Sequence, residues 1–375
     1  MKDGCVRYKI SFIKPNFPTS DEIVADYSEI VSSNWFTNFG PKEQSFSKKS
    51  AEFISTDVYA TTIANCTLGI EAAIAELFQS DRKKVLLPSF TFAAGAEAIL
   101  RSGFEPLFID VDRESWQPNI EQAAQVLSES DDIAGILLCN VFGVGNTNIT
   151  EWEKLALKFA KPLIIDSAAG FGSKYSDEEK VGTRGDCEIF SMHATKPFAI
   201  GEGGLVVSKN EKLIRRIREW QNFGFGTNRQ VQQIGTNAKL QEINAAIGLR
   251  QLDKFDERLN GRRAMLKLYK QLLKTDEYSF QQNDENSTVP FASVVLASQD
   301  HATAARKALA EAGVEARQYY EPLHLQALLS SYVDRAVSLE VTEFIASRII
   351  SLPVHDNMDE KDVQYIAKVI KDHEI

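Results

Sequence analysis

Cysteine is scarce in this sequence, and its spacing excludes a disulfide-rich scaffold. The 375 residues contain four cysteines with no paired CxxC motif, at Cys5, Cys66, Cys139 and Cys187. Scattered cysteines are typical of proteins kept in reducing compartments. We therefore expect a cytoplasmic protein.

Long apolar runs are also missing. The N-terminal stretch MKDGCVRYKISF has no apolar core of the kind found in signal peptides, and the least polar internal run, residues 133–150, is interrupted by glycine and asparagine. A membrane-spanning helix needs about 20 mostly apolar residues. The sequence therefore predicts neither a signal peptide nor a membrane span, and it shows no internal repeat.

Positive charge is in the minority. The chain carries 42 Lys and Arg against 52 Asp and Glu, a formal net charge of −10. This balance argues against a nucleic-acid binder that depends on broad phosphate neutralisation, so an anionic substrate would need local cationic groups. The length suits one large domain and a smaller one, each with its own core.

One lysine, Lys196, lies in a run of small, apolar and hydroxyl residues, GDCEIFSMHATKPFAIGEGGLVV at 185–207. Pro197 biases Lys196 away from helical dihedrals and toward a strand or loop. Ser191, at the end of a short apolar run, adds a hydroxyl donor five residues earlier. A partly desolvated lysine can act as an amine nucleophile toward an aldehyde cofactor, although most lysines are ordinary surface charges.

A second stretch, KPLIIDSAAGFGS, favours the nucleophile over the surface-charge interpretation of Lys196. Leu163 to Ile165 is typical of a buried strand, and the strand ends on Asp166. Ligand-binding groups gather at the carboxyl ends of strands in α/β sheets. A carboxylate there can keep the ring nitrogen of pyridoxal phosphate protonated, although Asp166 alone is equally compatible with a turn or a helix cap.

Short apolar runs alternate with helix-like segments through the first two thirds of the chain. The runs are Val85–Leu87, 104–111, Ile133–Cys139 and Leu163–Ile165, and the segments between them include 120–127 and 151–159. This alternation predicts a mostly parallel sheet with helices on both faces, a three-layer α/β/α arrangement. A helix is also expected over 21–33, and another after Thr67, which is either a plain N-cap or a phosphate ligand at the helix start.

The chain is expected to divide after its middle. Apolar residues at helical spacing predict one long helix from Lys239, which Asn260 and Gly261 should end. We therefore predict a large domain over 1–258, with its N-terminal helix packed toward the small domain, and a small α+β domain over 259–375. Residues 276–287 are expected to form a solvated loop.

Asp166, together with SMHATK at 191–196 and GEGG at 201–204, resembles the cofactor signature of a known family. This family is the DegT/DnrJ/EryC1/StrS group of pyridoxal-phosphate-dependent sugar aminotransferases. The resemblance extends from NWFTNFGP at 34–41 to LPVHDNMDEKDV at 352–363. It implies the fold of the type I pyridoxal-phosphate enzymes, pyridoxal 5'-phosphate as cofactor, and no metal.

The resemblance also implies roles for the residues around the cofactor. Lys196 would bind the cofactor covalently and later act as the base that moves a proton. Asp166 would pair with the ring nitrogen, Phe92 would stack on the ring, and Thr67 and Ser191 would bind the phosphate.

At three further positions the resemblance is less direct. Cys66 stands where the family commonly has glycine, and Ala169 stands where a glutamine or histidine usually contacts the ring oxygen. Asn237 would reach the cofactor phosphate of a second subunit, which implies a homodimer with shared sites, although by default it is an N-cap.

The remaining candidates would bind substrate. Each also has a plainer interpretation, such as an apolar plug for the aromatic loop, a structural histidine, or an arginine in an ion pair between domains. The candidates are Trp35, His193, Arg229, Lys239, Arg317, Tyr319, Tyr320 and His324.

The resemblance predicts a transaminase that moves an amino group from an amino acid, expected to be L-glutamate, to a nucleotide-linked keto-6-deoxy sugar. The similarity of SMHATK to the C4-acting branch favours the sugar C4, and cell-surface polysaccharide of the O-antigen type is the expected pathway. A related dehydratase branch carries histidine in place of the lysine, so Lys196 argues against it. A non-catalytic ligand sensor with the same fold is the third hypothesis, and Lys196 and Asp166 weigh against it.

Overall fold

The computed structural model describes residues 8–79 and 81–373. Cys5 and the first part of the N-terminal stretch considered above lie outside the described residues. No helix in the described part of the chain combines the length and apolarity that a bilayer crossing requires.

A seven-stranded sheet forms the centre of the molecule, in the order β1-β7-β6-β5-β4-β2-β3. The five strands from β6 to β3 are parallel, and β7 pairs antiparallel with both β6 and the edge strand β1. The strands are β1 (Tyr59–Ile63), β2 (Lys84–Pro88), β3 (Glu105–Ile109), β4 (Ile133–Cys139), β5 (Leu163–Asp166), β6 (Cys187–Ser191) and β7 (Gly204–Ser208).

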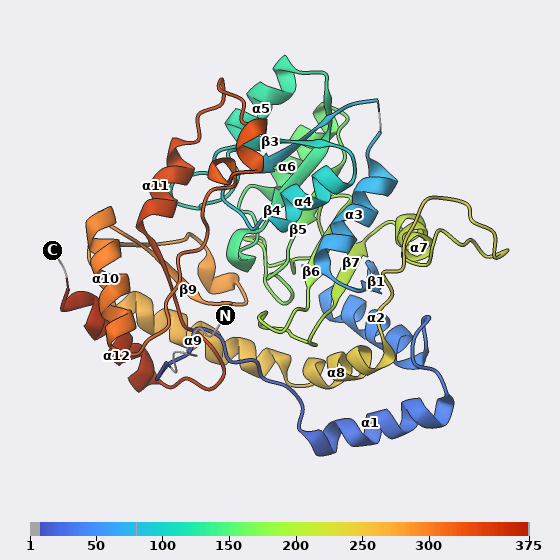
Figure 1. Ribbon diagram of the computed structural model, residues 1–375, viewed down its shortest axis with the longest axis horizontal. Coiled ribbons are helices and arrows are strands. Elements are labelled where there is room, and N and C mark those ends of the chain that lie inside the picture. The colour runs from blue at the N-terminus through green and yellow to red at the C-terminus, as the bar shows by residue number, and fades with distance from the viewer. Residues whose placement is uncertain (1–7, 80, 374–375) are drawn as a thin grey trace.

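Helices cover both faces of this sheet, because its strands are buried almost throughout and have apolar side chains on both sides. One face packs against α2 (Pro41–Ile54), α5 (Ile120–Glu129), α6 (Ile149–Lys158), α8 (Glu242–Leu252) and the first part of α9 (Phe255–Leu272). The other face packs against α3 (Cys66–Leu77), α4 (Ala94–Arg101) and α7 (Glu211–Trp220) (Figure 1). The expected three-layer α/β/α architecture is confirmed.

Most of the predicted elements are present within one or two residues. The expected helix over 21–33 is α1 (Ser20–Ser33), and it begins with a capping box between Thr19 and Glu22. The helix α1 lies against α8, held by ion pairs from Asp26 to Lys42 and Arg250. It is the segment before α1 that reaches the C-terminal part of the chain, where Ile10 pairs with Val314.

The prediction of one long helix from Lys239 to Asn260 was wrong. Two helices stand there, since α8 ends at Leu252 and α9 begins at Phe255. Asn260 and Gly261 lie inside α9, where an added Cβ on Gly261 would meet no atom within 4 Å. A glycine on the solvated side of a helix costs little enough that tertiary packing overrides it.

The helix α9 connects two hydrophobic cores. Its early residues Phe255 and Leu259 pack with the large sheet, whereas Leu266 and Tyr269 pack into a separate core. This change of core along α9 supports a domain boundary close to 258/259, which we retain as a proposal.

The second core belongs to a three-stranded antiparallel sheet in the order β10-β9-β8. The strands are β8 (Tyr278–Phe280), β9 (Ala292–Leu296) and β10 (Ile349–Leu352), and the helices that accompany them are α10 (Gln299–Glu311), α11 (Glu340–Arg348) and α12 (Glu360–Lys371). Four short 3-10 helices complete the described elements: η1 (Val141–Gly143), η2 (Asp284–Asn286), η3 (Leu323–Leu325) and η4 (Leu329–Tyr332). The loop expected over 276–287 is thus partly wrong, because β8 and η2 lie in it.

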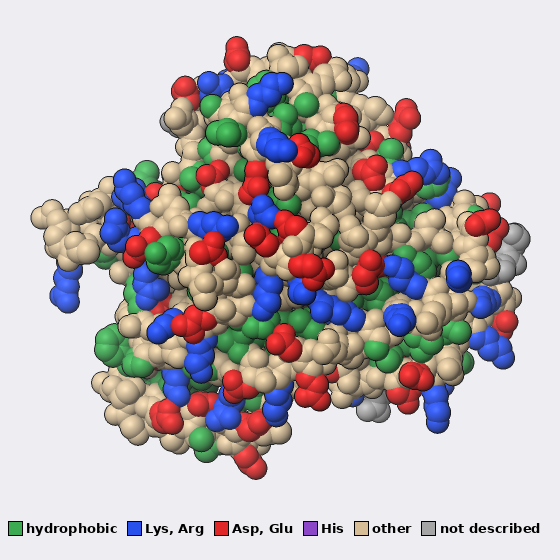
Figure 2. Space-filling view, turned by 180° about the vertical axis from the view of Figure 1, so that it is seen from behind, with side chains coloured by type: hydrophobic (Ala, Val, Ile, Leu, Met, Phe, Trp, Pro, Cys, Tyr) green, Lys and Arg blue, Asp and Glu red, His purple; other side chains and the backbone are tan. Residues whose placement is uncertain are grey.

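An arm formed by residues 222–237 projects from the body after α7, at the edge of the molecule (Figure 1). Asn222 pairs with Asn237 at its base, and Phe225 pairs with Val231 farther out. The rear face of the molecule carries acidic and basic side chains interspersed with hydrophobic ones (Figure 2).

Candidate active site

A cavity of about 780 Å³ opens at the carboxyl ends of β4, β5 and β6, beside the N-terminus of α3. Parallel strands direct their carboxyl ends to one edge of the sheet, which is why residues distant in the sequence meet there. Ten of the predicted site residues line this cavity: Cys66, Thr67, Phe92, Asp166, Ala169, Ser191, His193, Lys196, Tyr319 and Tyr320.

Asp166 is buried at the end of β5, and one of its two carboxylate oxygens is held in place. The amide of Ala168 donates to Oδ1 at 3.0 Å, and the thiol of Cys66 approaches the same oxygen at 3.8 Å. No described residue donates a hydrogen bond to Oδ2. Burial raises the pKa of Asp166, while the Ala168 amide and the positive charge of Lys196 act against that rise. The site therefore presents one unpaired carboxylate oxygen near a lysine.

Lys196 lies on a tight turn between β6 and β7, as its neighbour Pro197 indicated. The turn is closed by hydrogen bonds from the Ala194 amide to the Gly201 carbonyl and from the Met192 amide to the Gly203 carbonyl, each 2.8 Å long. Gly201 has a φ of +97°, a conformation that side chains disfavour. These bonds hold Lys196 at the cavity.

The start of α3 closes one end of the cavity. Asn65, not Thr67, is the N-cap, because its side chain accepts from the Leu68 amide at 2.9 Å. The first-turn amides of Cys66 and Thr67 have no partner within the helix and carry the positive end of its dipole. An added Cβ on Gly204 would lie 2.9 Å from the Asn65 carbonyl carbon, so glycine is what lets β7 approach the helix start. With the Ser191 hydroxyl nearby, this end suits an anion such as phosphate.

Aromatic rings form the opposite wall. Phe92 is 61% exposed, and its ring centroid lies 6.0 Å from that of Tyr320. Tyr320 packs in turn against Phe142 at 5.3 Å. Phe92 is therefore free to stack on a flat ring in the cavity.

His193 lies at the rim beside Lys196. Its Nδ1 accepts from the Thr195 amide at 3.2 Å, and its Nε2 faces Glu202 Oε1 at 3.6 Å. The ring is therefore positioned by two neighbours and borders the same cavity.

The other predicted substrate residues do not line the cavity. His324 is buried, with Nδ1 2.7 Å from the Ser89 hydroxyl and Nε2 3.2 Å from Glu343. Arg317 pairs with Glu315 at 2.6 Å, which leaves it only partly free for an anion. His324 therefore connects the segments that carry Ser89 and Glu343.

Four predicted residues lie outside the lining of the cavity on exposed segments. Trp35 is 45% exposed in the loop before α2. The side chain of Lys239 donates to Asn237 at 2.7 Å at the base of the arm, and Arg229 lies near its tip with a φ of +57°.

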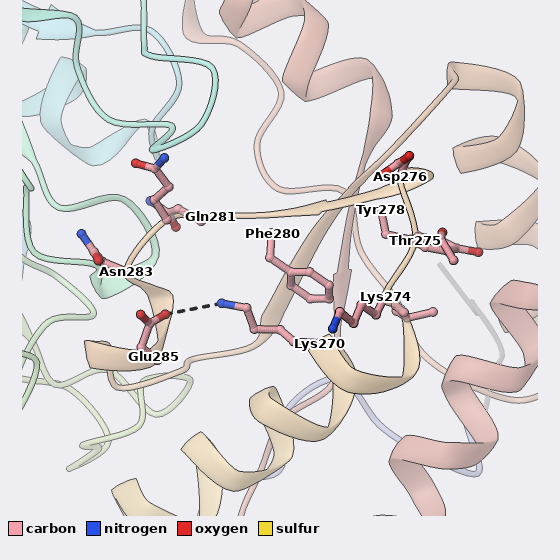
Figure 3. Close-up of a pocket in the computed structure, with 11 residues that line it drawn as sticks. Lys270, Lys274, Thr275, Asp276, Tyr278, Phe280, Gln281, Asn283 and Glu285 are labelled. Carbon is pink, nitrogen blue, oxygen red and sulfur yellow. Dashed lines mark hydrogen bonds and ion pairs between the residues drawn. The ribbon is translucent and has the colours of Figure 1, made fainter.

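A second cavity, of about 700 Å³, lies between the end of α9 and residues 275–285 (Figure 3). None of the predicted site residues lines it. Its Lys270 pairs with Asp284 at 2.6 Å and with Glu285 at 3.4 Å, and Gln281 points away from the centre of the cavity. The first cavity is therefore the candidate active site.

Comparison with known proteins agrees with this geometry. The family model of the DegT/DnrJ/EryC1/StrS aminotransferase family matches residues 19–371. The chain belongs to this family. It is a pyridoxal-phosphate-dependent aminotransferase, and the expected fold and cofactor are confirmed.

Several curated relatives of this aminotransferase cover most of its length. It is 43% identical over 373 residues to Protein Mb3436c of Mycobacterium bovis. The alignment covers 98% of this chain and 90% of the relative. It is 29% identical over 350 residues to GDP-perosamine synthase of Escherichia coli O157:H7, covering 92% of this chain and 93% of the relative. The dTDP-4-amino-4,6-dideoxy-D-glucose transaminase of Shigella dysenteriae is 28% identical over 372 residues, with 96% and 97% covered.

Solved structures show the same architecture. A Bacillus cereus ATCC 10987 protein assigned as a PLP-dependent aminotransferase superposes with a TM-score of 0.90 at 32% identity, covering 96% of this chain and 99% of that chain. DesI, solved in the presence of its TDP-sugar product, superposes with a TM-score of 0.86 at 26% identity and covers 95% and 91%.

The residues of the aminotransferase cavity fit pyridoxal phosphate. Lys196 would hold its aldehyde carbon, the free oxygen of Asp166 would pair with its ring nitrogen, and the α3 amides with Ser191 would hold its phosphate. When bound, the cofactor supplies an electron sink for negative charge at the amino-bearing carbon.

Sequence reasoning missed several residues that line the aminotransferase cavity. Asn140 directly follows β4, in the same way that Asp166 ends β5, so the strand-end rule that found one applies to the other. Thr91 and Cys139 also line the cavity, and the Thr91 hydroxyl donates to the Cys139 sulfur at 3.0 Å. Glu202 is the glutamate of the GEGG motif, and no spacing pattern indicated that it faces His193.

Proposed function

We propose that this aminotransferase transfers an amino group from L-glutamate to C4 of a nucleotide-linked 4-keto-6-deoxy sugar, for cell-surface polysaccharide of the O-antigen type. The single observation that carries the proposal is that Lys196 and the buried carboxylate of Asp166 enter one cavity of about 780 Å³. The names of the relatives support the substrate class, since a GDP-perosamine synthase and a transaminase of a 4-amino-4,6-dideoxy sugar align over nearly the whole chain.

The side chains have distinct roles in this proposal. Lys196 takes the proton from the donor amino acid and returns it on the other side of the transferred nitrogen, because it lies on a turn that faces the cavity. Asp166 holds a proton on the ring nitrogen from a water-poor position. His193 and Glu202 stand at the rim, where the hydroxyls of a sugar would enter.

A panel of nucleotide-linked keto-sugars tests the proposal directly. Each sugar is incubated with holoenzyme and L-glutamate, and the products are identified by mass and by NMR. We expect amine at C4 and one 2-oxoglutarate for each amine formed. A product aminated only at C3 contradicts the assigned position, and transfer from another amino acid alone contradicts the donor.

The two alternative functions give different results in the same assay. A dehydratase would release ammonia without leaving nitrogen on the sugar, and a ligand sensor would bind sugar without turning over glutamate. Lys196 and Asp166 in one cavity support the transaminase over both.

We also propose that the enzyme is a cytoplasmic homodimer with shared active sites. Asn237 and Arg229 lie on the arm and not in the cavity of their own chain. The arm exposes apolar side chains that a second copy would cover, with Ile234 93% exposed and Val231 65% exposed. Scattered cysteines favour the cytoplasm.

A further inference from the structure

A buried network of hydrogen bonds lies beneath the candidate active site, and its centre is a carboxyl group with no role in the proposed chemistry. Glu188, on β6, is 0% exposed. Its Oε1 accepts from the amides of Gly182 at 2.7 Å and Arg184 at 3.0 Å. Its Oε2 accepts from the Ser167 hydroxyl at 2.7 Å, and the carboxyl group also accepts from the Tyr175 hydroxyl.

The network extends from Glu188 to the cavity through two hydroxyl groups. The side-chain amide of Asn140 donates to the Ser167 hydroxyl at 2.9 Å and to the Tyr175 hydroxyl at 3.3 Å. An amide NH2 group has two hydrogens, so these two bonds use both of them. Asn140 itself lines the cavity.

The direction of every bond in this network is set by the charge on Glu188. All four groups around the carboxylate are hydrogen-bond donors. An ionised carboxylate only accepts hydrogen bonds, whereas a protonated carboxyl group also has a hydrogen to donate. A protonated Glu188 would present a hydroxyl that faces donors only. One of the two bridging hydroxyls would then accept from Glu188 as well as from Asn140, and its own hydrogen would lose its acceptor. Protonation of Glu188 therefore leaves a buried donor without a partner and weakens the hold of the network on Asn140.

Asn140 and Ser167, the two residues that the network holds, are both connected to Asp166. Ser167 follows Asp166 in the chain, and the backbone amide of Asn140 donates to the Asp166 carbonyl at 2.9 Å. The Ser167 amide donates to the Ile189 carbonyl of β6 at 2.9 Å. A change at Glu188 is thus transmitted through the Ser167 hydroxyl to Asp166, the residue assigned to the ring nitrogen of the cofactor.

We propose that ionised Glu188 is a positioning residue that holds Asn140 in the lining of the cofactor cavity and Ser167 next to Asp166, so that the enzyme loses affinity for pyridoxal phosphate when Glu188 takes up a proton. This inference rests on the proposed function only for the use of the cavity. Burial raises the pKa of Glu188 to about 7, against its four hydrogen bonds, which puts the transition in an accessible range.

The groups that face Glu188 do not provide another titration near neutral pH. Burial raises the pKa of Tyr175 well above its usual value, so its hydroxyl remains a donor. Burial also raises the pKa of Cys187, the neighbour of Glu188 on β6. The guanidinium of Arg184 is turned to Glu153, Asp177 and Glu179, and only its backbone amide meets Glu188.

The test is the affinity of apoenzyme for pyridoxal phosphate, measured by absorbance titration between pH 6 and pH 8 with no sugar present. Glu188→Gln keeps the size of the side chain, removes the charge and places an amide against Ser167 or the loop amides. We expect it to bind the cofactor about tenfold more weakly than wild type at pH 8. The ratio should fall toward one at pH 6, because wild-type Glu188 is then protonated as well.

A matched control separates this effect from the loss of any buried carboxylate. Asp110 is buried at the end of β3, where it accepts from the amides of Val111, Val341 and Thr342, but it does not line the cavity. Asp110→Asn should leave the cofactor affinity and its pH dependence unchanged.

Two outcomes would overturn the proposal. One is equal affinity of wild type and Glu188→Gln at pH 8, and the other is an affinity ratio that stays constant from pH 6 to pH 8. If Glu188→Gln does not fold, Ser167→Ala replaces it, since that variant removes one bridging hydroxyl and leaves the carboxylate. It should weaken cofactor binding in the same direction, and unchanged affinity there overturns the proposal too. Failure of the sugar assay would leave these titrations intact, so the two hypotheses fail separately.

Discussion

Asp166 ends strand β5 and Lys196 lies on the turn between β6 and β7, and each is held by backbone hydrogen bonds near its position. The Ala168 amide fixes one oxygen of Asp166, while the bonds of the 192–203 turn fix the backbone around Lys196. Preorganised groups of this kind need little rearrangement when a cofactor enters. Which lysine binds the cofactor covalently therefore depends on which lysine side chain faces the cavity.

Borohydride reduction of the holoenzyme should attach the cofactor irreversibly to Lys196, because this lysine alone among the described residues lines the cavity. Peptide mapping by mass spectrometry after reduction locates the label. Lys239, whose pKa is lowered by burial, is the natural control site. A label on Lys239 or on any other lysine would contradict the assignment.

Replacing Asp166 with alanine should leave cofactor bound but nearly inactive. The phosphate contacts at α3 and Ser191 remain, whereas the ring nitrogen loses the carboxylate that keeps it protonated. We expect kcat to fall roughly a hundredfold or more, with a smaller change in cofactor affinity. Near-normal turnover would remove Asp166 from the mechanism.

Glu188 should also leave a signature in stability. Because its pKa is raised to about 7 in the folded protein, the native state holds a proton that the unfolded chain releases between about pH 4.5 and 7. The native state thus binds more protons in that range, and stability falls as pH rises through it. Relative to Glu188→Gln, the free energy of unfolding of wild-type apoenzyme should fall by about 2.5 kcal/mol from pH 5 to pH 8.

Urea unfolding at both pH values measures this difference. Asp284, whose pKa burial also raises to about 7 although Lys270 lies beside it, contributes equally to both proteins and cancels. If the difference in unfolding free energy between wild type and Glu188→Gln does not change with pH, Glu188 has the same pKa in the folded and unfolded states.

At the scale of elements, the contact between β7 and the start of α3 shapes the phosphate end of the cavity. Gly204→Ala should push α3 away, since its Cβ would lie 2.9 Å and 3.0 Å from backbone atoms of Asn65 and Cys66. We expect cofactor affinity to fall about tenfold. Gly261→Ala is the control, because its Cβ meets nothing within 4 Å inside α9, and it should stabilise the protein by about 0.5–1 kcal/mol. Unchanged cofactor titration of Gly204→Ala would contradict this account.

The strands were the most predictable elements. Buried strands such as β4 and β5 are continuous apolar runs, and a strand that ends on a polar residue marks the ligand edge of a parallel sheet. Helix boundaries were less predictable, since Thr67 and Asn65 are both good N-caps and only the hydrogen bond to Leu68 distinguishes them. The interruption between Leu252 and Phe255 has no glycine or proline to announce it.

At the scale of the whole molecule, residues far apart in the sequence were the hardest to place. The motif EARQYYEPLH contributes Tyr319 and Tyr320 to the cavity but turns His324 inward to Ser89. A motif read along the chain does not reveal which side of a turn each residue faces. Glu188 was hidden for the same reason, because its side-chain partners Ser167 and Tyr175 lie 21 and 13 residues before it in the chain.

The arm is the feature that the single chain leaves unexplained, and the proposed shared-site dimer would account for it. We predict that Lys196→Ala and Asn237→Ala, each severely impaired alone, regain activity when they are unfolded and refolded together. If Asn237 serves the partner's cofactor site, a mixed dimer holds one site with both defects and one site with none. Activity per heterodimer should then approach that of one wild-type site.

The same experiment requires proof that heterodimers form, which distinct affinity tags on the two variants provide. Mixing Lys196→Ala with Asp166→Ala is the matched control, because both residues line the cavity of their own chain, so each site of that mixed dimer keeps one defect. That mixture should stay inactive. If Asn237 acts within its own chain, the first mixture behaves like the control, since every site again carries one defect. Isolated heterodimers without recovered activity would therefore rule out the shared site and leave the apolar arm without the partner that we assign to it.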